Sequence, residues 1–282
     1  MDMNRLRYIG DRPVGPDHRV YISGAIGINH NGNLGDAVAL IDAAVDEGCD
    51  AVTFQKRTPE LCVSLEQQCT EQDTPWGQMS YLAYRHRVEF NADQYGQIVQ
   101  HCGQRGIAWL AAPLDIPSVD FLELMNPPAH RIAPAALTDD ALLGRLREAG
   151  RTVIVSTARA SIEQIRHAAD VLGRSRLILC HTTNASADEL DLTMIDTLRR
   201  EFPDVVVSHC GHEVGHRATL AAVALGASFL ERRITLDRAS WGSEQAEALD
   251  PVDLQRLIRE VRALESTLAD RAAPSGQFAS VA

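Results

Sequence analysis

Residues 152–172 read TVIVSTARASIEQIRHAADVL, and this stretch holds one complete strand–helix unit. Thr152–Ser156 is rich in β-branched side chains, which favour a buried strand. Ser161 and Gln164 then form the Ser-x-x-Gln pattern of a capping box. An apolar stripe at helical spacing follows at Ile165, Ala168 and Leu172. The stretch therefore predicts a strand, a short turn and an amphipathic helix, in that order.

The same alternation extends in both directions along the chain. Seven further apolar runs predict strands at Val20–Ile26, Ala51–Gln55, Ile107–Ala112, His130–Ala133, Leu177–His181, Val205–His209 and Ser228–Ile234. Each is followed by a helix-like segment, and the last helix opens at Asp250-Pro251. Eight such units in 282 residues predict an α/β fold, a single (β/α)8 TIM barrel over residues 1–282. An open doubly wound sheet would usually show fewer units or a second domain.

Two segments fall outside this alternation. Residues 1–19 precede the first strand, and we expect them to form an N-terminal extension, a hairpin or lid under the barrel. Residues 57–90 are polar, carry Trp76, Tyr81 and Tyr84, and are expected to form a long loop over the barrel mouth. A loop of that length inside a compact domain is more often functional than idle.

Composition excludes several classes of partner. A formal net charge of −11 argues against nucleic acid or an anionic membrane surface as the main partner. The first residues lack the apolar run of a signal peptide, and no stretch approaches the length of a membrane span. The six cysteines form no C-x-x-C pair. We therefore expect a reduced, cytoplasmic protein.

Polar side chains gather where the predicted strands end. The carboxyl ends of barrel strands meet at one mouth, where such barrels bind substrates. The residues that the sequence places there include Asn29, Gln55, Lys56, Arg57, Arg131, Ser156, Asn184, His212, Glu231 and Arg233. A mouth of this composition suits a small anionic or sugar-like substrate.

Five motifs occur in order along the chain. They are Gly27-Ile-Asn-His-Asn-Gly32, Ala51-Val-Thr-Phe-Gln-Lys-Arg-Thr-Pro-Glu60, Gly211-His-Glu213, Glu231-Arg-Arg-Ile-Thr-Leu-Asp237 and Trp241-Gly-Ser-Glu-Gln-Ala246. Together they resemble the barrel domain of the sialic acid synthases, which condense phosphoenolpyruvate with an acylated amino sugar. The resemblance implies an aldolase-like barrel enzyme and a homodimer. The antifreeze-like C-terminal domain of the full-length synthases has no counterpart in these 282 residues.

Matches and departures are both found at the positions that the resemblance assigns to the site. The matching residues are Asn29, Gln55, Ser156, Asn184, His212 and Glu231, and the family also has Lys-Arg at Lys56 and Arg57. The changed ones are Ala25 for a glutamate, Thr53 for a phosphate-binding lysine, Arg131 for a lysine, Pro134 and Ala136 for a serine and a glutamate, Ala185-Ser186 for Tyr-Pro, and Arg233 for a histidine. The resemblance implies that phosphoenolpyruvate lies among Lys56, Arg131, Ser156 and Asn184. It also implies that the acceptor carbonyl faces His212, Glu231 and Arg233.

The change at Arg233 bears on the cofactor. The family binds a divalent metal through two histidines, of which this chain keeps only His212. Two imidazoles with oxygen ligands suit Mn²⁺ or Zn²⁺, whereas one imidazole beside a guanidinium does not. A fixed cation can still polarise an aldehyde oxygen. We expect Arg233 either to replace the ion or to form a structural ion pair with Glu231 or Glu213.

A rebuilt zinc site is a second alternative for the metal. Cys180-His181 and His209-Cys210-x-His212 end neighbouring strands. Strand alternation lets only some of these side chains face inward together.

Lys56 is the only lysine among 27 basic residues, and three roles stay open for it. It could bind a phosphate or carboxylate together with Arg57. It could pair structurally with Glu60. It could also form a Schiff base with a carbonyl substrate, as aldolase lysines do.

We therefore expect a phosphoenolpyruvate-dependent, aldol-type condensation with a small sugar or aldehyde, giving a 2-keto-3-deoxy acid. One alternative is a repurposed barrel enzyme that acts on another carbonyl or sugar-like substrate without phosphoenolpyruvate. The other is a degenerate, non-catalytic relative that binds a small anion or a partner.

Overall fold

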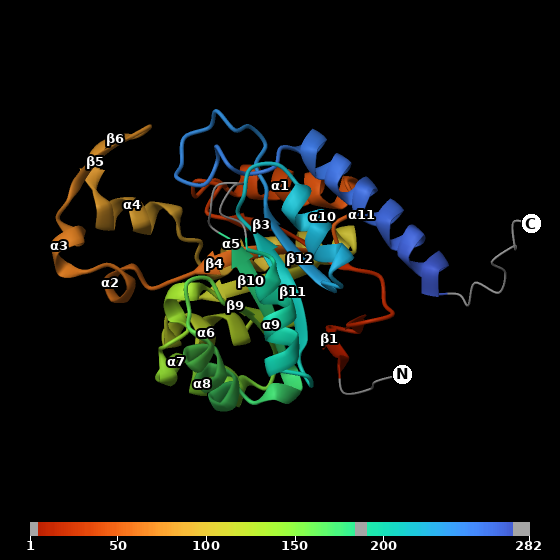
Figure 1. Cartoon of the computed structure of the whole chain (residues 1–282). Helices are drawn as coiled ribbons and strands as arrows, with labels where there is room; N and C mark the ends of the chain where they lie inside the picture. Colours follow the sequence, from red (N-terminus) through yellow and green to blue (C-terminus); the bar gives the residue numbers. More distant parts are fainter. Residues whose placement is uncertain (1–4, 184–190, 273–282) are drawn as a thin grey trace, which may run out of the picture.

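The computed structural model describes residues 5–183 and 191–272, and its centre is a closed barrel of parallel strands (Figure 1). In order around the barrel the strands are β3 (Tyr21–Gly27), β4 (Ala51–Lys56), β7 (Ala108–Pro113), β8 (Ala129–Ile132), β9 (Thr152–Ser156), β10 (Leu177–Thr183), β11 (Val206–Gly211) and β12 (Phe229–Arg233), which closes on β3. The predicted (β/α)8 barrel is confirmed, and the predicted strands agree with these bounds to within two residues.

Helices surround the barrel. They are α1 (Leu34–Asp46), α5 (Ala92–Arg105), α6 (Ile116–Glu123), α7 (Asp140–Ala149), α8 (Ile162–Leu172), α9 (Thr193–Glu201), α10 (Arg217–Ala224) and α11 (Pro251–Ala272), with short 3₁₀ turns at η2 (Pro134–Ala136) and η3 (Arg174–Arg176). The capping box expected from Ser161 and Gln164 forms at the start of α8. Of the described helices, none has both the length and the apolar character needed to cross a membrane.

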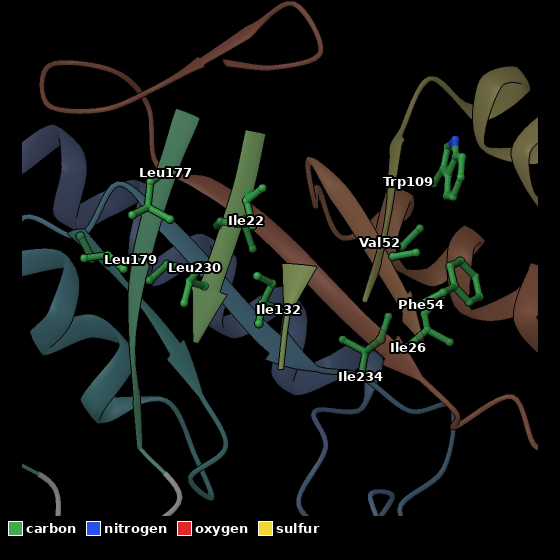
Figure 2. Close-up of a cluster of buried hydrophobic side chains, with 14 of the residues drawn as sticks. Ile22, Ile26, Val52, Phe54, Trp109, Ile132, Leu177, Leu179, Leu230 and Ile234 are labelled. Carbon is green, nitrogen blue, oxygen red and sulfur yellow. The ribbon is translucent and has the colours of Figure 1, made fainter. Parts of the chain in front are cut away.

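Strand alternation separates two faces of the barrel wall. One set of buried side chains points outward and packs under the helices; it includes Ile22, Val52, Phe54, Leu179 and Leu230 (Figure 2). The alternate residues point into the barrel and form a second apolar cluster, which includes Tyr21, Leu110, Ile178 and Phe229. The same period of two decides which strand-end residues reach the interior of the mouth.

A hairpin lies at the amino-terminal end of the barrel. It consists of β1 (Arg7–Ile9) paired antiparallel with β2 (Arg12–Val14). Ile9 and Val14 join the inner apolar cluster, and the Thr152 hydroxyl at the start of β9 donates to the Tyr8 carbonyl at 2.6 Å. The hairpin therefore covers the end of the barrel opposite the mouth.

The segment 57–90 is not the irregular loop that its polar composition suggested. It contains α2 (Pro59–Cys62), α3 (Leu65–Gln68), the antiparallel pair β5 (Glu71–Thr74) and β6 (Gly77–Ser80), and α4 (Tyr81–Val88). Local capping explains the difference, since the Ser64 and Ser80 hydroxyls accept backbone N–H groups at the starts of α3 and α4. We call this segment the arm; it projects to one side of the barrel (Figure 1).

Two ring contacts join the arm to the barrel. The rings of Trp76 and Tyr84 lie 5.8 and 5.2 Å from the ring of Trp241, in the loop between β12 and α11. Both contacts are edge-on, a geometry that aromatic pairs prefer.

Candidate functional site

A cavity of about 190 Å³ opens at the carboxyl ends of the barrel strands. It is lined by Ala25, Gly27, Thr53, Phe54, Gln55, Ala112, Arg131, Ala133, Pro134, His212, Glu231, Arg233 and Glu244. The structure thus brings together five residues that the sequence placed at the mouth: Gln55, Arg131, His212, Glu231 and Arg233. We call this space the mouth cavity.

Strand alternation on β12 places two of these residues. Phe229 belongs to the inner cluster, so Glu231 and Arg233 share its inward face, whereas Leu230 packs in the outer cluster. Arg232 accordingly points outward, where its guanidinium lies 3.3 Å from Glu213 and donates to the Thr219 hydroxyl at 2.9 Å. This buried pair fixes the strand ends that carry His212 and Arg233.

Arg131 and Glu231 form a buried ion pair across the mouth cavity. Their side chains are only 9% and 2% exposed, so each charge depends on the other. Burial is the largest single effect on the pKa of Arg131 and would lower it, but Glu231, Cys210 and Cys180 together raise it. An Nη group of Arg131 also donates to the Ser156 hydroxyl at 2.9 Å. Ser156 therefore orients Arg131.

Glu231 keeps one carboxylate oxygen for other contacts. Its Oε1 faces Arg131, while its buried Oε2 has no hydrogen-bond partner among the described residues. A buried carboxylate oxygen in that position can accept a proton from a substrate hydroxyl or water.

His212 is held in its neutral form. Burial, together with the Arg233 and Arg131 guanidiniums, lowers the pKa of His212 to about 3. Its Nδ1 is buried and makes no hydrogen bond within the described part of the chain. A neutral imidazole can donate to or accept from a bound substrate.

Arg233 has different partners from those expected for a structural pair. Its guanidinium lies 3.2 Å from Glu244 and 3.9 Å from Glu247, both in the loop before α11. The expected partners Glu231 and Glu213 are taken by Arg131 and Arg232. The expected pairing considered only glutamates at or just after the strand ends. Glu244 and Glu247 instead reach Arg233 from a loop that lies over the mouth.

Glu244 is a charged mouth residue to which the sequence assigned no role of its own. It belongs to Trp241-Gly-Ser-Glu-Gln-Ala246, one of the five motifs that carry the family resemblance. In the structure Glu244 lines the cavity, and a Cβ at Gly27 would lie 3.0 Å from its Oε2. Gly27 has φ +55°, so this position favours glycine both for its backbone and for the room it leaves Glu244.

Lys56 lies apart from the mouth cavity. Val52 and Phe54 point outward on β4, and Lys56 has the same parity. Its Nζ donates to the Phe90 carbonyl at 3.1 Å and lies 3.4 Å from Glu89, so its ion pair is with Glu89 rather than with Glu60, which pairs with His86. The structure therefore does not bring Lys56 together with Arg131.

Arg57 and Lys56 both contact Glu89, and Arg57 also contacts Gln55 at the mouth cavity. Its Nε lies 2.9 Å from Glu89, and its Nη2 donates to the Gln55 side-chain carbonyl. Burial raises the pKa of Glu89 although both cations oppose that shift. Arg57, which Glu89 holds in place, thus orients the side chain of Gln55, and Gln55 lines the mouth cavity.

Asn29 supports the loop over the mouth. The side-chain amide of Asn29 donates to the Ile234 carbonyl at 2.8 Å. The backbone carbonyl of Asn29 accepts from the side-chain amide of Gln245 at 3.0 Å. Asn184, the remaining residue expected at the site, lies outside the described residues.

The alternative zinc site is divided between the two faces of the wall. Cys180 and Cys210 belong to the inner cluster, whereas His181 and His209 have the outward parity. Across residues 5–183 and 191–272, no group of three or more His, Cys, Asp or Glu side chains could hold a metal ion.

Comparisons with known proteins agree with this architecture. A family model described as the NeuB family matches residues 40–273. N-acetylneuraminate-9-phosphate synthase from Homo sapiens is 31% identical over 265 residues, covering 91% of this chain and 73% of that protein. N,N'-diacetyllegionaminic acid synthase from Campylobacter jejuni is 29% identical over 254 residues, covering 86% and 76%. The crystal structure of N-acetylneuraminic acid (sialic acid) synthetase from Leptospira borgpetersenii serovar Hardjo-bovis, in complex with citrate, superposes with a TM-score of 0.85 at 23% identity, covering 99% of this chain and 93% of that one.

Proposed function

Because the chain belongs to the NeuB family, we propose that it catalyses a phosphoenolpyruvate-dependent, aldol-type condensation with a small sugar or aldehyde. The product is a 2-keto-3-deoxy acid. The observation that carries this proposal is the convergence of Arg131, His212, Glu231 and Arg233 on one cavity at the carboxyl ends of β8, β11 and β12. Relatives named as acid-sugar synthases favour the same chemistry.

The proposed reaction needs an anion site and a place for developing negative charge. The C3 carbon of phosphoenolpyruvate bonds to the aldehyde carbon, whose oxygen takes the electron pair and then a proton. Water adds at C2 and phosphate leaves, so one water is consumed and one phosphate is released.

Arg131 is proposed to bind the carboxylate or phosphate of phosphoenolpyruvate. A guanidinium has five N–H donors, so its contacts with Glu231 and Ser156 leave others for an anion. Gln55 and Asn184 are proposed as further substrate-binding residues, and Asn29 and Arg57 as residues that hold the cavity wall. The Oε2 atom of Glu231 is proposed to accept the proton of the attacking water.

His212 and Arg233 are proposed to face the acceptor aldehyde. Neutral His212 can donate its proton to the new alkoxide, and Arg233 can stabilise the negative charge as it forms. Lys56 is proposed to act indirectly, because it holds Glu89, which in turn holds Arg57. Its contacts favour this structural pairing over a Schiff base.

Phosphate release tests the proposal. Tag-free protein is incubated with phosphoenolpyruvate and a panel of aldoses and N-acylated amino sugars, and inorganic phosphate and the 2-keto acid are measured. We expect release that requires an acceptor and that falls about 10²- to 10⁴-fold in Glu231→Gln. Glu163→Gln, an exposed glutamate at the start of α8, is the matched control and should keep full activity. Folded protein that releases no phosphate with any acceptor would contradict the proposal.

A further inference from the structure

One wall of the mouth cavity carries a fixed guanidinium. Arg233 follows Glu231 on the inward face of β12, and its side chain is only 24% exposed. Glu244 at 3.2 Å and Glu247 at 3.9 Å hold it from the loop side. Two carboxylates thus restrict a side chain that would otherwise have many rotamers.

The donor set around Arg233 does not fit a divalent metal ion, the cofactor that the family resemblance implies. Among the residues that the structure describes, His212 is the only imidazole that lines the cavity. The two lining carboxylates are each paired with a guanidinium, Glu231 with Arg131 and Glu244 with Arg233. An ion bound to His212 would find, among these residues, no lining carboxylate that is not already paired with a guanidinium, and it would lie close to the guanidiniums of Arg233 and Arg131, whose positive charge opposes it.

From this mismatch we infer that Arg233 itself supplies the positive charge at the acceptor oxygen, so the barrel works without a divalent ion. The inference rests on the proposed condensation and deepens it, because it gives Arg233 the role that a divalent ion would otherwise have. As the C–C bond forms, the aldehyde oxygen gains the electron pair of its π bond, and the N–H groups of Arg233 donate to that oxygen. His212 then transfers a proton to it. No ion is bound or released in the cycle.

The location of Glu244 strengthens the inference. Glu244 takes one edge of the guanidinium, and the remaining N–H donors can face the cavity that Arg233 lines. The charge of an arginine persists at every physiological pH, as a metal ion's does. A preorganised donor of this kind costs no reorganisation when the oxygen becomes negative.

A gain-of-site experiment tests the metal part without any activity assay. Replacing the guanidinium by an imidazole in Arg233→His would place two histidines beside Glu244, a set that suits Mn²⁺ or Zn²⁺. Calorimetry with Mn²⁺ and with Zn²⁺ on tag-free, chelator-treated protein should give no saturable binding for the wild type. It should give one equivalent for Arg233→His, lost again in Arg233→His/His212→Ala. Arg259→His, which adds an imidazole on the exposed face of α11, should behave as the wild type.

Two outcomes would overturn the inference. One is stoichiometric binding of either ion by the wild type that disappears in His212→Ala. The other is an Arg233→His protein that folds, judged by its circular dichroism, but binds neither ion, because Arg233 would then not occupy a metal-competent position.

Activity tests the catalytic part. Phosphate release by chelator-treated wild type should equal that of untreated protein. Arg233→Gln should lower kcat about 10²- to 10³-fold with little change in KM for phosphoenolpyruvate, and Arg233→Lys should recover part of the loss. Activity that falls on chelation and returns with Mn²⁺ would overturn the inference. If no acceptor gives phosphate release in any variant, the proposed condensation fails, while the metal-binding result still stands by itself.

Discussion

The ion pair between Arg131 and Glu231 gives the sharpest energetic prediction. Both side chains are almost fully buried, at 9% and 2% exposure. Removing one partner of such a pair leaves an uncompensated charge in the interior, which costs about 3–5 kcal/mol. We therefore expect Arg131→Met and Glu231→Leu each to lower the free energy of unfolding by about that amount.

The double variant should behave differently from the sum of the two. Arg131→Met/Glu231→Leu removes both charges and replaces them with apolar side chains of similar volume. Buried pairs replaced in this way are often neutral in stability or better. The double variant should therefore unfold within about 2 kcal/mol of the wild type, with a coupling energy of at least about 3 kcal/mol.

Urea denaturation of the wild type, the two single variants and the double variant measures this coupling energy. Equal m-values would show that the unfolded states are comparable. The exposed pair Arg166–Glu201, whose side chains are 43% and 35% exposed, is the matched control. Its coupling should stay below about 1 kcal/mol. If the losses in the free energy of unfolding of the two single variants simply add in the double variant, the view that each charge depends on the other is refuted.

His212, Lys56 and Trp241 can each be tested by a single substitution. Since His212 has a folded-state pKa of about 3 against about 6.5 when unfolded, only the unfolded chain binds this proton between those values, so stability falls as the pH drops below 6.5. Denaturation at pH 7 and pH 5 should show the wild type losing about 2 kcal/mol more than His212→Asn. Lys56→Ala should lower stability by about 1 kcal/mol through its contact with Glu89 yet leave KM for phosphoenolpyruvate nearly unchanged; a raised KM at unchanged stability would indicate direct binding. Trp241→Ala removes the ring contact with Trp76 and should speed tryptic cleavage within the arm, and an unchanged cleavage rate would count against that contact as an anchor.

The sequence predicted the barrel because its signal is periodic and local. Each strand is a short β-branched run, and each helix carries its own start signal, as Ser161 and Gln164 do for α8. Such signals do not depend on distant residues. The arm was missed as structure because its elements are short, at four to eight residues, and its helices and hairpin are polar. Their caps, such as Ser64 and Ser80, are common in loops too.

The candidate site was predictable only in part, for a related reason. Strand order and alternation place Arg131, Glu231 and Arg233 at one mouth without any knowledge of side-chain contacts. The partners of these charges depend on tertiary structure. The pairing of Arg233 with Glu244 requires a loop to fold back over the mouth, and no local pattern encodes that approach. Lys56 shows a different limit. Its position at the end of a strand was predicted correctly, but strand alternation places its side chain on the outward face of β4, away from the cavity.

Binding of phosphoenolpyruvate by metal-free protein shows whether Arg131 forms an anion site in a mouth cavity that needs no divalent ion. Calorimetry is performed on chelator-treated protein whose metal content has been measured, with the wild type compared with the folded Arg131→Met/Glu231→Leu variant. We expect saturable binding at one site per chain in the wild type and none in the variant, because Arg131 supplies the anion contact. Absence of heat in the wild type at millimolar phosphoenolpyruvate, or binding that appears only after Mn²⁺ is added, would contradict it.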